Sequence, residues 1–221
     1  MMDTESEKML MELAPEYVDV LEMIKKHQIP ESYPLDDMDL LAKESNSLGP
    51  KSLFFREVYV SYCGCCLLSY DWIRPLADWI GTRTCLEIMA GSGALSMALK
   101  NCGVSIVATD DFSWGNELWL RSLWTDVECI DARATIDKHK ADIVICSWPP
   151  IGEPIAKEAL LKMRAVNPNA LMIYIGEPAG ASCADDDFFE TLHPVNDRSF
   201  YKAVKTFKPF YTLHDRPYLI R

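Results

Sequence analysis

Hydrophobic residues in the middle of the chain form short continuous runs, separated by segments with helical spacing. Short apolar runs bounded by turn residues are typical of strands that are buried on both faces of a sheet. We expect five such strands, at residues 85–89, 104–108, 127–130, 141–146 and 170–175. Apolar side chains at three- and four-residue steps predict helices between them. Strands that alternate with helices predict an α/β fold with a mostly parallel sheet.

The first third of the chain has a different pattern. Apolar side chains recur at three- and four-residue steps over residues 5–27, which predicts an amphipathic helix, and a short second helix is expected over 36–44. Residues 67–80 read as the helix before the first strand, although Pro75 requires a first turn or a kink. We therefore divide the chain into an N-terminal helical extension, residues 1–69, and an α/β domain, residues 70–221.

Three further segments complete the expected elements. The aromatic stretch 117–124 is helix-like, and the acids of 185–187 favour the N-terminus of a helix because they complement its dipole. The tail reads as two strands, 203–213 and 218–221, around a turn at 215–217. These two strands would form an antiparallel pair at the far edge of the sheet.

A glycine turn follows the first expected strand. Glu87 lies inside the strand, Gly91 and Gly93 form the turn, and the next strand ends in Asp110 and Asp111. Strand, glycine turn, helix, strand and terminal acid make a βαβ unit that binds a nucleoside-containing ligand. Glycines let the backbone approach such a ligand closely, and a carboxylate at the tip of the second strand can accept both hydrogens of a ribose diol.

A dinucleotide fingerprint would place a third glycine where this chain has Ser96. Instead, the pattern Glu87-x3-Gly91-x-Gly93 resembles the first motif of class I S-adenosylmethionine-dependent methyltransferases. The resemblance covers about residues 70–221. It implies a seven-stranded, mostly parallel sheet flanked by helices, and S-adenosyl-L-methionine as the cofactor. The alternative is a βαβ turn without a ligand.

The resemblance also implies a role for individual residues. The glycine turn would pack against the methionine part of the cofactor, Glu87 would help to place its ammonium, and Asp110 would hold the ribose. Asp131, after the third strand, would contact the adenine amino group, or would instead cap the next helix. The expected cofactor-binding residues are Glu87, Ala90, Gly91, Gly93, Asp110, Asp111, Asp131 and Ala132.

The fourth strand ends in Ser147-Trp148-Pro149-Pro150. Ligands of open α/β sheets bind beyond the carboxyl ends of the strands, so this tip is expected beside the reacting sulfonium. Amino-group methyltransferases have a polar residue, two prolines and then an aromatic here, whereas Trp148 precedes the prolines in this chain. We expect Ser147, Trp148 and Pro149 to be the catalytic residues. A strand end with Trp148 packed inward is the alternative.

The net charge and the cysteine spacing indicate which partners, cellular locations and metals to expect. The chain of 221 residues has a net charge of −11, which opposes unaided binding to polyphosphate, so we expect no free duplex DNA as a partner. No apolar run is long enough for a membrane span, and the acidic N-terminus does not resemble a signal peptide; we expect a cytoplasmic location. Cys63-Gly64-Cys65-Cys66 does not have the spacing of a paired zinc site, which favours buried thiols over a metal.

The sequence thus predicts an enzyme that transfers a methyl group from S-adenosyl-L-methionine to a small molecule or a protein side chain. No metal is needed, because methyl transfer is a direct displacement that depends on alignment and on the exclusion of water. Two alternatives remain: methylation of a nucleobase amino group, and a catalytically silent scaffold that binds the cofactor. The sequence leaves the acceptor and the oligomeric state open.

Overall fold

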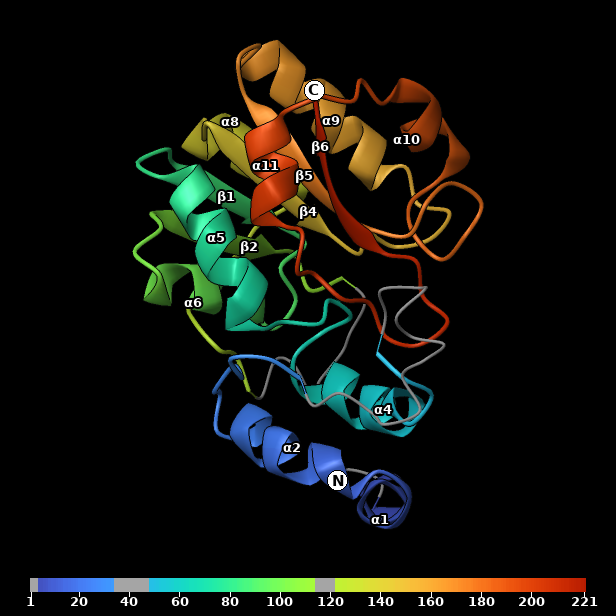
Figure 1. Ribbon diagram of the computed structural model, residues 1–221. Helices are drawn as coiled ribbons and strands as arrows, with labels where there is room; N and C mark the ends of the chain where they lie inside the picture. Colours follow the sequence, from blue (N-terminus) through green and yellow to red (C-terminus); the bar gives the residue numbers. More distant parts are fainter. Residues whose placement is uncertain (1–3, 34–47, 114–121) are drawn as a thin grey trace.

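Six strands form one sheet in the part of the chain that the computed structural model describes, residues 4–33, 48–113 and 122–221 (Figure 1). The strands are β1 (Cys85–Ile88), β2 (Ile106–Asp110), β3 (Val127–Cys129), β4 (Ile143–Ser147), β5 (Leu171–Gly176) and β6 (Arg216–Ile220). Their order is β3-β2-β1-β4-β5-β6, and only the last pair is antiparallel. This is the order of a doubly wound sheet, in which strand order reverses between β1 and β4. The predicted α/β fold, with a mostly parallel sheet flanked by helices, is confirmed.

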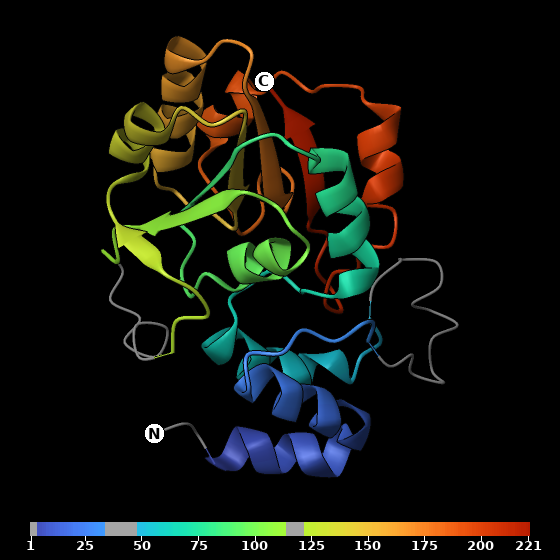
Figure 2. The ribbon, with the colours of Figure 1, turned by 90° about the vertical axis from the view of Figure 1, so that its left-hand side faces the viewer.

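Helices cover both faces of this sheet (Figure 2). One face holds α5 (Tyr70–Ile80), α6 (Ala94–Asn101) and α11 (Arg198–Ala203), and the other holds α8 (Ala132–His139), α9 (Ile155–Val166) and α10 (Asp186–Thr191). Strand β4 is apolar from Ile143 to Cys146 because both of its faces are buried. Ile143 and Ile145 belong to the core on one face, and Val144 and Cys146 to the core on the other, because successive side chains of a strand point in opposite directions.

The N-terminal segment forms a layer of helices beyond the carboxyl ends of the parallel strands (Figure 1). It consists of α1 (Thr4–Leu13), the short 3-10 helix η1 (Pro15–Tyr17), α2 (Val18–Lys25) and α4 (Ser52–Tyr62). The single helix predicted over 5–27 is therefore wrong. Pro15 begins a new turn there, because proline lacks the N–H that a continuing helix needs.

This layer does not have a core of its own. Leu10 of α1 and Phe55 of α4 belong to the same hydrophobic cluster as Ile145 of β4 and Leu219 of β6. The expected boundary at residue 69 stays a prediction, and the apolar packing is continuous across it.

The predicted strand over 203–213 is wrong, and the described residues contain six strands instead of seven. Its aromatic residues pack onto helices. Phe207 meets Trp72 of α5 edge to face, with ring centroids 5.1 Å apart, and Phe210 meets Tyr59 of α4 at 5.5 Å. Apolar residues in an irregular segment can thus mimic a strand pattern when they anchor the segment to neighbouring helices.

Two smaller expectations have a clear outcome. Pro75 lies inside α5 rather than in its first turn, and the carbonyl of Asp71, which Pro75 cannot bond, accepts the Thr206 hydroxyl at 2.8 Å. Asp185 caps α10 by accepting the N–H of Phe188 at 2.9 Å, which confirms the predicted helix start. The helices expected over 36–44 and 117–124 lie outside or largely outside the described residues.

Candidate functional site

The glycine turn after β1 is held by two hydrogen bonds and by close packing against the segment that leads into β3. Gly91 donates its N–H to Asp110 Oδ2 at 2.7 Å, and the Ser92 hydroxyl donates to the carbonyl of Cys63 at 2.7 Å. Gly93 is the N-cap of α6 and has a φ of +76°, and a Cβ there would lie 2.9 Å from methyl carbons of both Thr125 and Val127. Only glycine fits at this position, because it tolerates the positive φ and leaves room for the side chains of Thr125 and of Val127, the first residue of β3.

Two cavities adjoin the turn at the carboxyl edge of the sheet. The smaller has a volume of about 50 Å³ and is lined by Glu87, the glycine turn, Ser147 and the loop 63–66. The larger, of about 730 Å³, extends past the tips of β2, β3 and β4. Cys65, Met89 and Trp148 line both. The smaller cavity joins β1 to β4, which is the switch point where ligands of doubly wound sheets bind.

Nine of the eleven residues predicted for the site line one or both cavities. The smaller cavity has Glu87, Ala90, Gly91 and Ser147; the larger has Asp110, Asp111, Asp131 and Pro149; Trp148 lines both. Gly93 and Ala132 line neither. Gly93 shapes the turn, and Ala132 is a buried residue at the start of α8. The roles of these residues in ligand binding stay predictions.

Glu87 is a buried carboxyl group at the centre of the sheet, only 2% exposed. The Ser96 hydroxyl, one turn into α6, donates a hydrogen bond to its Oε2. Burial raises the pKa of Glu87 to about 7, and the bonds from Ser96 offset part of the rise. A charged partner in the smaller cavity would therefore decide whether this group is ionised near neutral pH.

The two acids after β2 and β3 have different surroundings. Asp110 is buried and accepts two backbone N–H groups, those of Gly91 and Phe112, each at 2.7 Å. Asp131 is the N-cap of α8 and also binds the Arg133 guanidinium, which lowers the pKa of the Asp131 carboxyl. The capping alternative for Asp131 is therefore observed, and any adenine contact would have to share this carboxylate with Arg133.

Backbone strain gathers at the same edge of the sheet. Met89 follows β1, Phe112 follows β2 and Trp148 follows β4, and their φ angles are +54°, +56° and +51°. Such angles are rare for bulky residues and cost about 1–3 kcal/mol each. Strained residues of this kind cluster at functional sites. Met89 and Trp148 directly follow their strands and line both cavities, and Phe112 lies two residues beyond the end of β2.

The proline loop after β4 is fixed by backbone bonds. Trp148 donates its N–H to the carbonyl of Ile175 at 2.7 Å, and the carbonyl of Pro149 accepts the N–H of Ala184 at 3.2 Å. The Pro149 carbonyl thus already has one donor. The Ser147 hydroxyl lies beside the thiol of Cys66, whose pKa is raised by burial.

Sequence reasoning missed two parts of the site. The loop 63–66 forms one wall of the smaller cavity, and Asp215, just before β6, binds the indole of Trp148 at 3.2 Å. No motif marks either part, because both reach the site through long-range packing. Within the described residues no group of three or more His, Cys, Asp and Glu side chains is arranged to hold a metal ion. Among these residues no helix is both long and apolar enough to cross a membrane.

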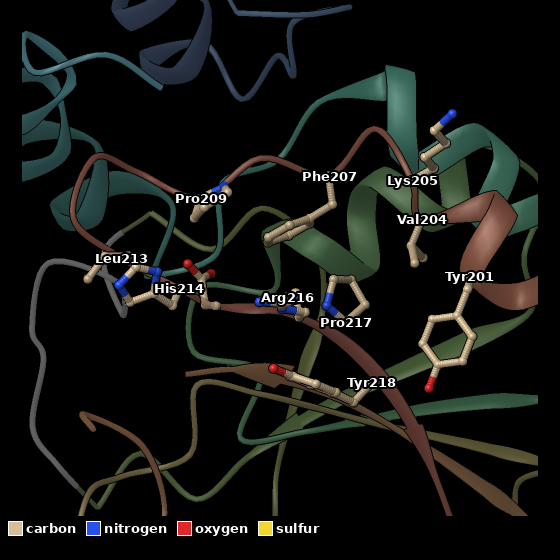
Figure 3. Close-up of a pocket in the computed structure, with 11 residues that line it drawn as sticks. Tyr201, Val204, Lys205, Phe207, Pro209, Leu213, His214, Arg216, Pro217 and Tyr218 are labelled. Carbon is tan, nitrogen blue, oxygen red and sulfur yellow. The ribbon is translucent and has the colours of Figure 1, made fainter. Parts of the chain in front are cut away.

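Another cavity, of about 400 Å³, lies beside β6 (Figure 3). It is lined by several nitrogen-containing and aromatic side chains, including Lys205, His214, Arg216 and Tyr218. Figure 3 shows that these side chains do not converge, since Lys205 extends away from His214 and Arg216. We assign no ligand to this cavity.

No family model matches the chain, and no curated protein matches it. Three solved structures illustrate its likeness to known folds. The ribosomal protein L11 methylase of Lactobacillus delbrueckii subsp. bulgaricus is 17% identical, with a TM-score of 0.34 over 51% of this chain and 63% of that chain. This chain therefore spans less than two thirds of the length of that methylase.

The other two structures cover more of the chain. Magnesium protoporphyrin IX methyltransferase from Synechocystis PCC 6803 with bound S-adenosylmethionine is 16% identical over 86% of this chain and 99% of that chain, with a TM-score of 0.41. Human N-acetylserotonin methyltransferase is 11% identical over 98% of this chain and 69% of that chain, with a TM-score of 0.44. Similarity at this level does not transfer an activity, so the function must follow from the side chains of this chain.

Proposed function

We propose that this protein is an S-adenosylmethionine-dependent methyltransferase that acts on a small molecule or a protein side chain. The observation that supports this most is the convergence of Glu87, the glycine turn and Asp110 on adjoining cavities at the switch point. Each of these features was predicted from the sequence for a different part of one ligand. The fold brings them to the edge of the sheet where such a ligand binds.

The chemistry of the two cavities fits this cofactor. A buried carboxyl with a raised pKa, such as Glu87, gains most from a cationic partner, and the cofactor carries an ammonium group. Asp110, at the tip of β2, lines the larger cavity, and we infer that its carboxylate also accepts hydrogen bonds from a ribose diol there, in addition to those from the backbone of Gly91 and Phe112. Its bond from Gly91 fixes this carboxylate against the turn, so the two binding elements are held together before a ligand arrives.

When bound, the cofactor supplies an electrophilic methyl group. The residues of this chain would align the acceptor and keep water out. Ser147 lines the smaller cavity beside Glu87, so its hydroxyl is the candidate that orients the acceptor atom. Trp148, at the junction of both cavities, would form the wall against which the acceptor packs. Pro149 would fix the loop rather than supply its carbonyl, which Ala184 already engages.

Calorimetry with S-adenosylmethionine and with its demethylated product tests the proposal. Both ligands should bind, and Asp110→Ala should weaken binding by roughly 1–3 kcal/mol, because the ribose hydroxyls lose a charged acceptor. Asp142→Ala is the matched control. Its carboxylate likewise accepts a backbone N–H, from Thr84 at 2.9 Å, but it lies before β4, at the opposite edge of the sheet.

Absence of heat with both ligands, together with saturable binding of a nicotinamide dinucleotide, would overturn the proposal. If the cofactor binds, incubation of the protein with tritiated cofactor and fractionated lysate identifies the acceptor. Label in a small molecule or a protein supports the proposed acceptor class, whereas label in nucleic acid supports a nucleobase. Cofactor binding without any transfer of label supports a silent scaffold.

A further inference from the structure

Asp215 is a buried carboxylate that the proposed reaction does not use. Its side chain comes from the turn before β6, 67 residues after Trp148, and the residue is only 3% exposed. Its Oδ2 accepts the indole N–H of Trp148 at 3.2 Å. Its Oδ1 is buried and has no hydrogen-bond partner among the described residues. Burying a carboxyl group with an oxygen that has no hydrogen-bond partner costs free energy, which indicates that Asp215 has a role beyond packing.

Trp148 holds an unusual conformation at the junction of the two cavities. Its φ is +51°, and it precedes Pro149, which further restricts its backbone. The backbone N–H is bound to Ile175, and the indole N–H is bound to Asp215. The ring therefore has one polar anchor, and it lines both the smaller and the larger cavity.

We propose that Asp215 is a positioning residue that fixes the indole of Trp148 as the shared wall of the two cavities. The inference that this wall serves a methyl donor rests on the proposed function; the Asp215–Trp148 contact itself does not. Without the carboxylate, the indole loses its anchor and the strained backbone after β4 is free to relax. The cavities would then no longer be preorganised for a ligand.

The strength of the hydrogen bond between the Trp148 indole and Asp215 should depend on pH. Burial raises the pKa of Asp215 to about 7, and the bond from Trp148 offsets part of the rise. Ionised Asp215 binds the indole N–H more strongly than the protonated acid, since charge-assisted hydrogen bonds are stronger. The anchor therefore tightens as pH rises through about 7. The charged or titratable groups around Asp215 are Arg56 of α4, Cys65 and Cys66 after α4, Glu177 and Cys183 after β5, Tyr218 of β6, and its neighbours His214 and Arg216.

The first test needs no ligand. The indole N–H resonance of Trp148 is identified in ¹⁵N-labelled protein by its loss in Trp148→Phe. Its chemical shift should change with pH around a midpoint near 7, and Asp215→Asn should abolish this change. Glu87 has a pKa in the same range, so Glu87→Gln serves as the control and should leave the midpoint in place. A resonance that does not respond to pH, or that titrates unchanged in Asp215→Asn, would overturn the proposal.

The second test measures binding of the demethylated cofactor. Asp215→Ala should weaken it about tenfold or more, as expected for a lost hydrogen bond to a charged group, and Asp215→Asn should restore part of the affinity through its amide oxygen. Trp79→Phe is the matched control. It removes an equivalent indole bond, from Trp79 to Asp197 at 3.3 Å, that lies outside both cavities.

A double-mutant cycle separates this coupling from loss of folding. If the two residues act as a unit, Asp215→Ala with Trp148→Phe should bind no more weakly than the weaker single variant. Additive losses, or losses matched by Trp79→Phe, would show that Asp215 only supports the fold and would overturn the proposal. If wild-type protein does not bind this ligand, the proposed function fails, while the pH response of the indole still decides the role of Asp215.

Discussion

Replacing Glu87 by Gln should change how the stability of this protein depends on pH. Burial raises the pKa of Glu87 from 4.5 to about 7, and the unfolded chain is expected to have the ordinary value. Between these two values the folded protein holds a proton that the unfolded chain has lost. The stabilising contribution of this group is therefore complete below about pH 4.5 and is lost as pH rises through about 7.

The size of the effect follows from the same shift. The gap between 4.5 and about 7 corresponds to roughly 3 kcal/mol of unfolding free energy lost across this range. Asp215, also raised to about 7, contributes a similar slope in both proteins. The difference between wild type and Glu87→Gln therefore isolates Glu87. Urea unfolding at a series of pH values measures it, and parallel pH profiles for the two proteins would refute the reasoning.

Proton release from the Glu87 carboxyl group should accompany binding of the proposed cofactor. An ammonium group beside Glu87 favours its ionised form, so binding near pH 6.5 should release up to about three-quarters of a proton. Calorimetry of the demethylated cofactor in two buffers of different protonation enthalpy measures this release, and affinity should rise with pH through about 7. Glu87→Gln should lose the proton release. Binding without proton exchange in the wild type would mean that Glu87 does not face the ammonium.

Three further predictions concern the turn, the acceptor and the partner. Gly93→Ala should destabilise the fold more than Gly103→Ala, by about 1–3 kcal/mol in urea unfolding: both have a positive φ, but only at Gly93 does the Cβ collide, with Thr125 and Val127. A smaller loss at Gly93 would contradict the packing described here. Ser147→Ala should lower turnover with nearly unchanged cofactor affinity, and equal losses of both would place the residue in the cofactor pocket instead. Duplex DNA should not bind at physiological salt, given the net charge of −11; micromolar affinity that falls steeply across a salt series, with labelled adenine or cytosine, would favour the nucleobase reading.

The βαβ unit could be predicted from the sequence because its signals are local. Glu87, Gly91 and Gly93 lie within seven residues, and Asp110 ends the next apolar run, so spacing alone places them around one turn. The alternating strands and helices fix the direction of the parallel strands in the same way. Their carboxyl ends must then meet at one edge, which brings the tip of β4 to the same place.

The rest of the site depends on contacts that have no sequence spacing. The loop 63–66 and Asp215 reach the cavities from segments far away along the chain, and polar residues in a loop or turn give no sign of what they will face. Aromatic residues at Phe207 and Phe210 look alike whether they form a strand or anchor a loop, because periodicity does not say which surface they bury against. The sequence by itself thus determined the parallel strands and the glycine turn, through local hydrophobic pattern and turn chemistry. Tertiary packing decided the edge of the sheet, the second wall of the cavities and the carboxylate that holds Trp148.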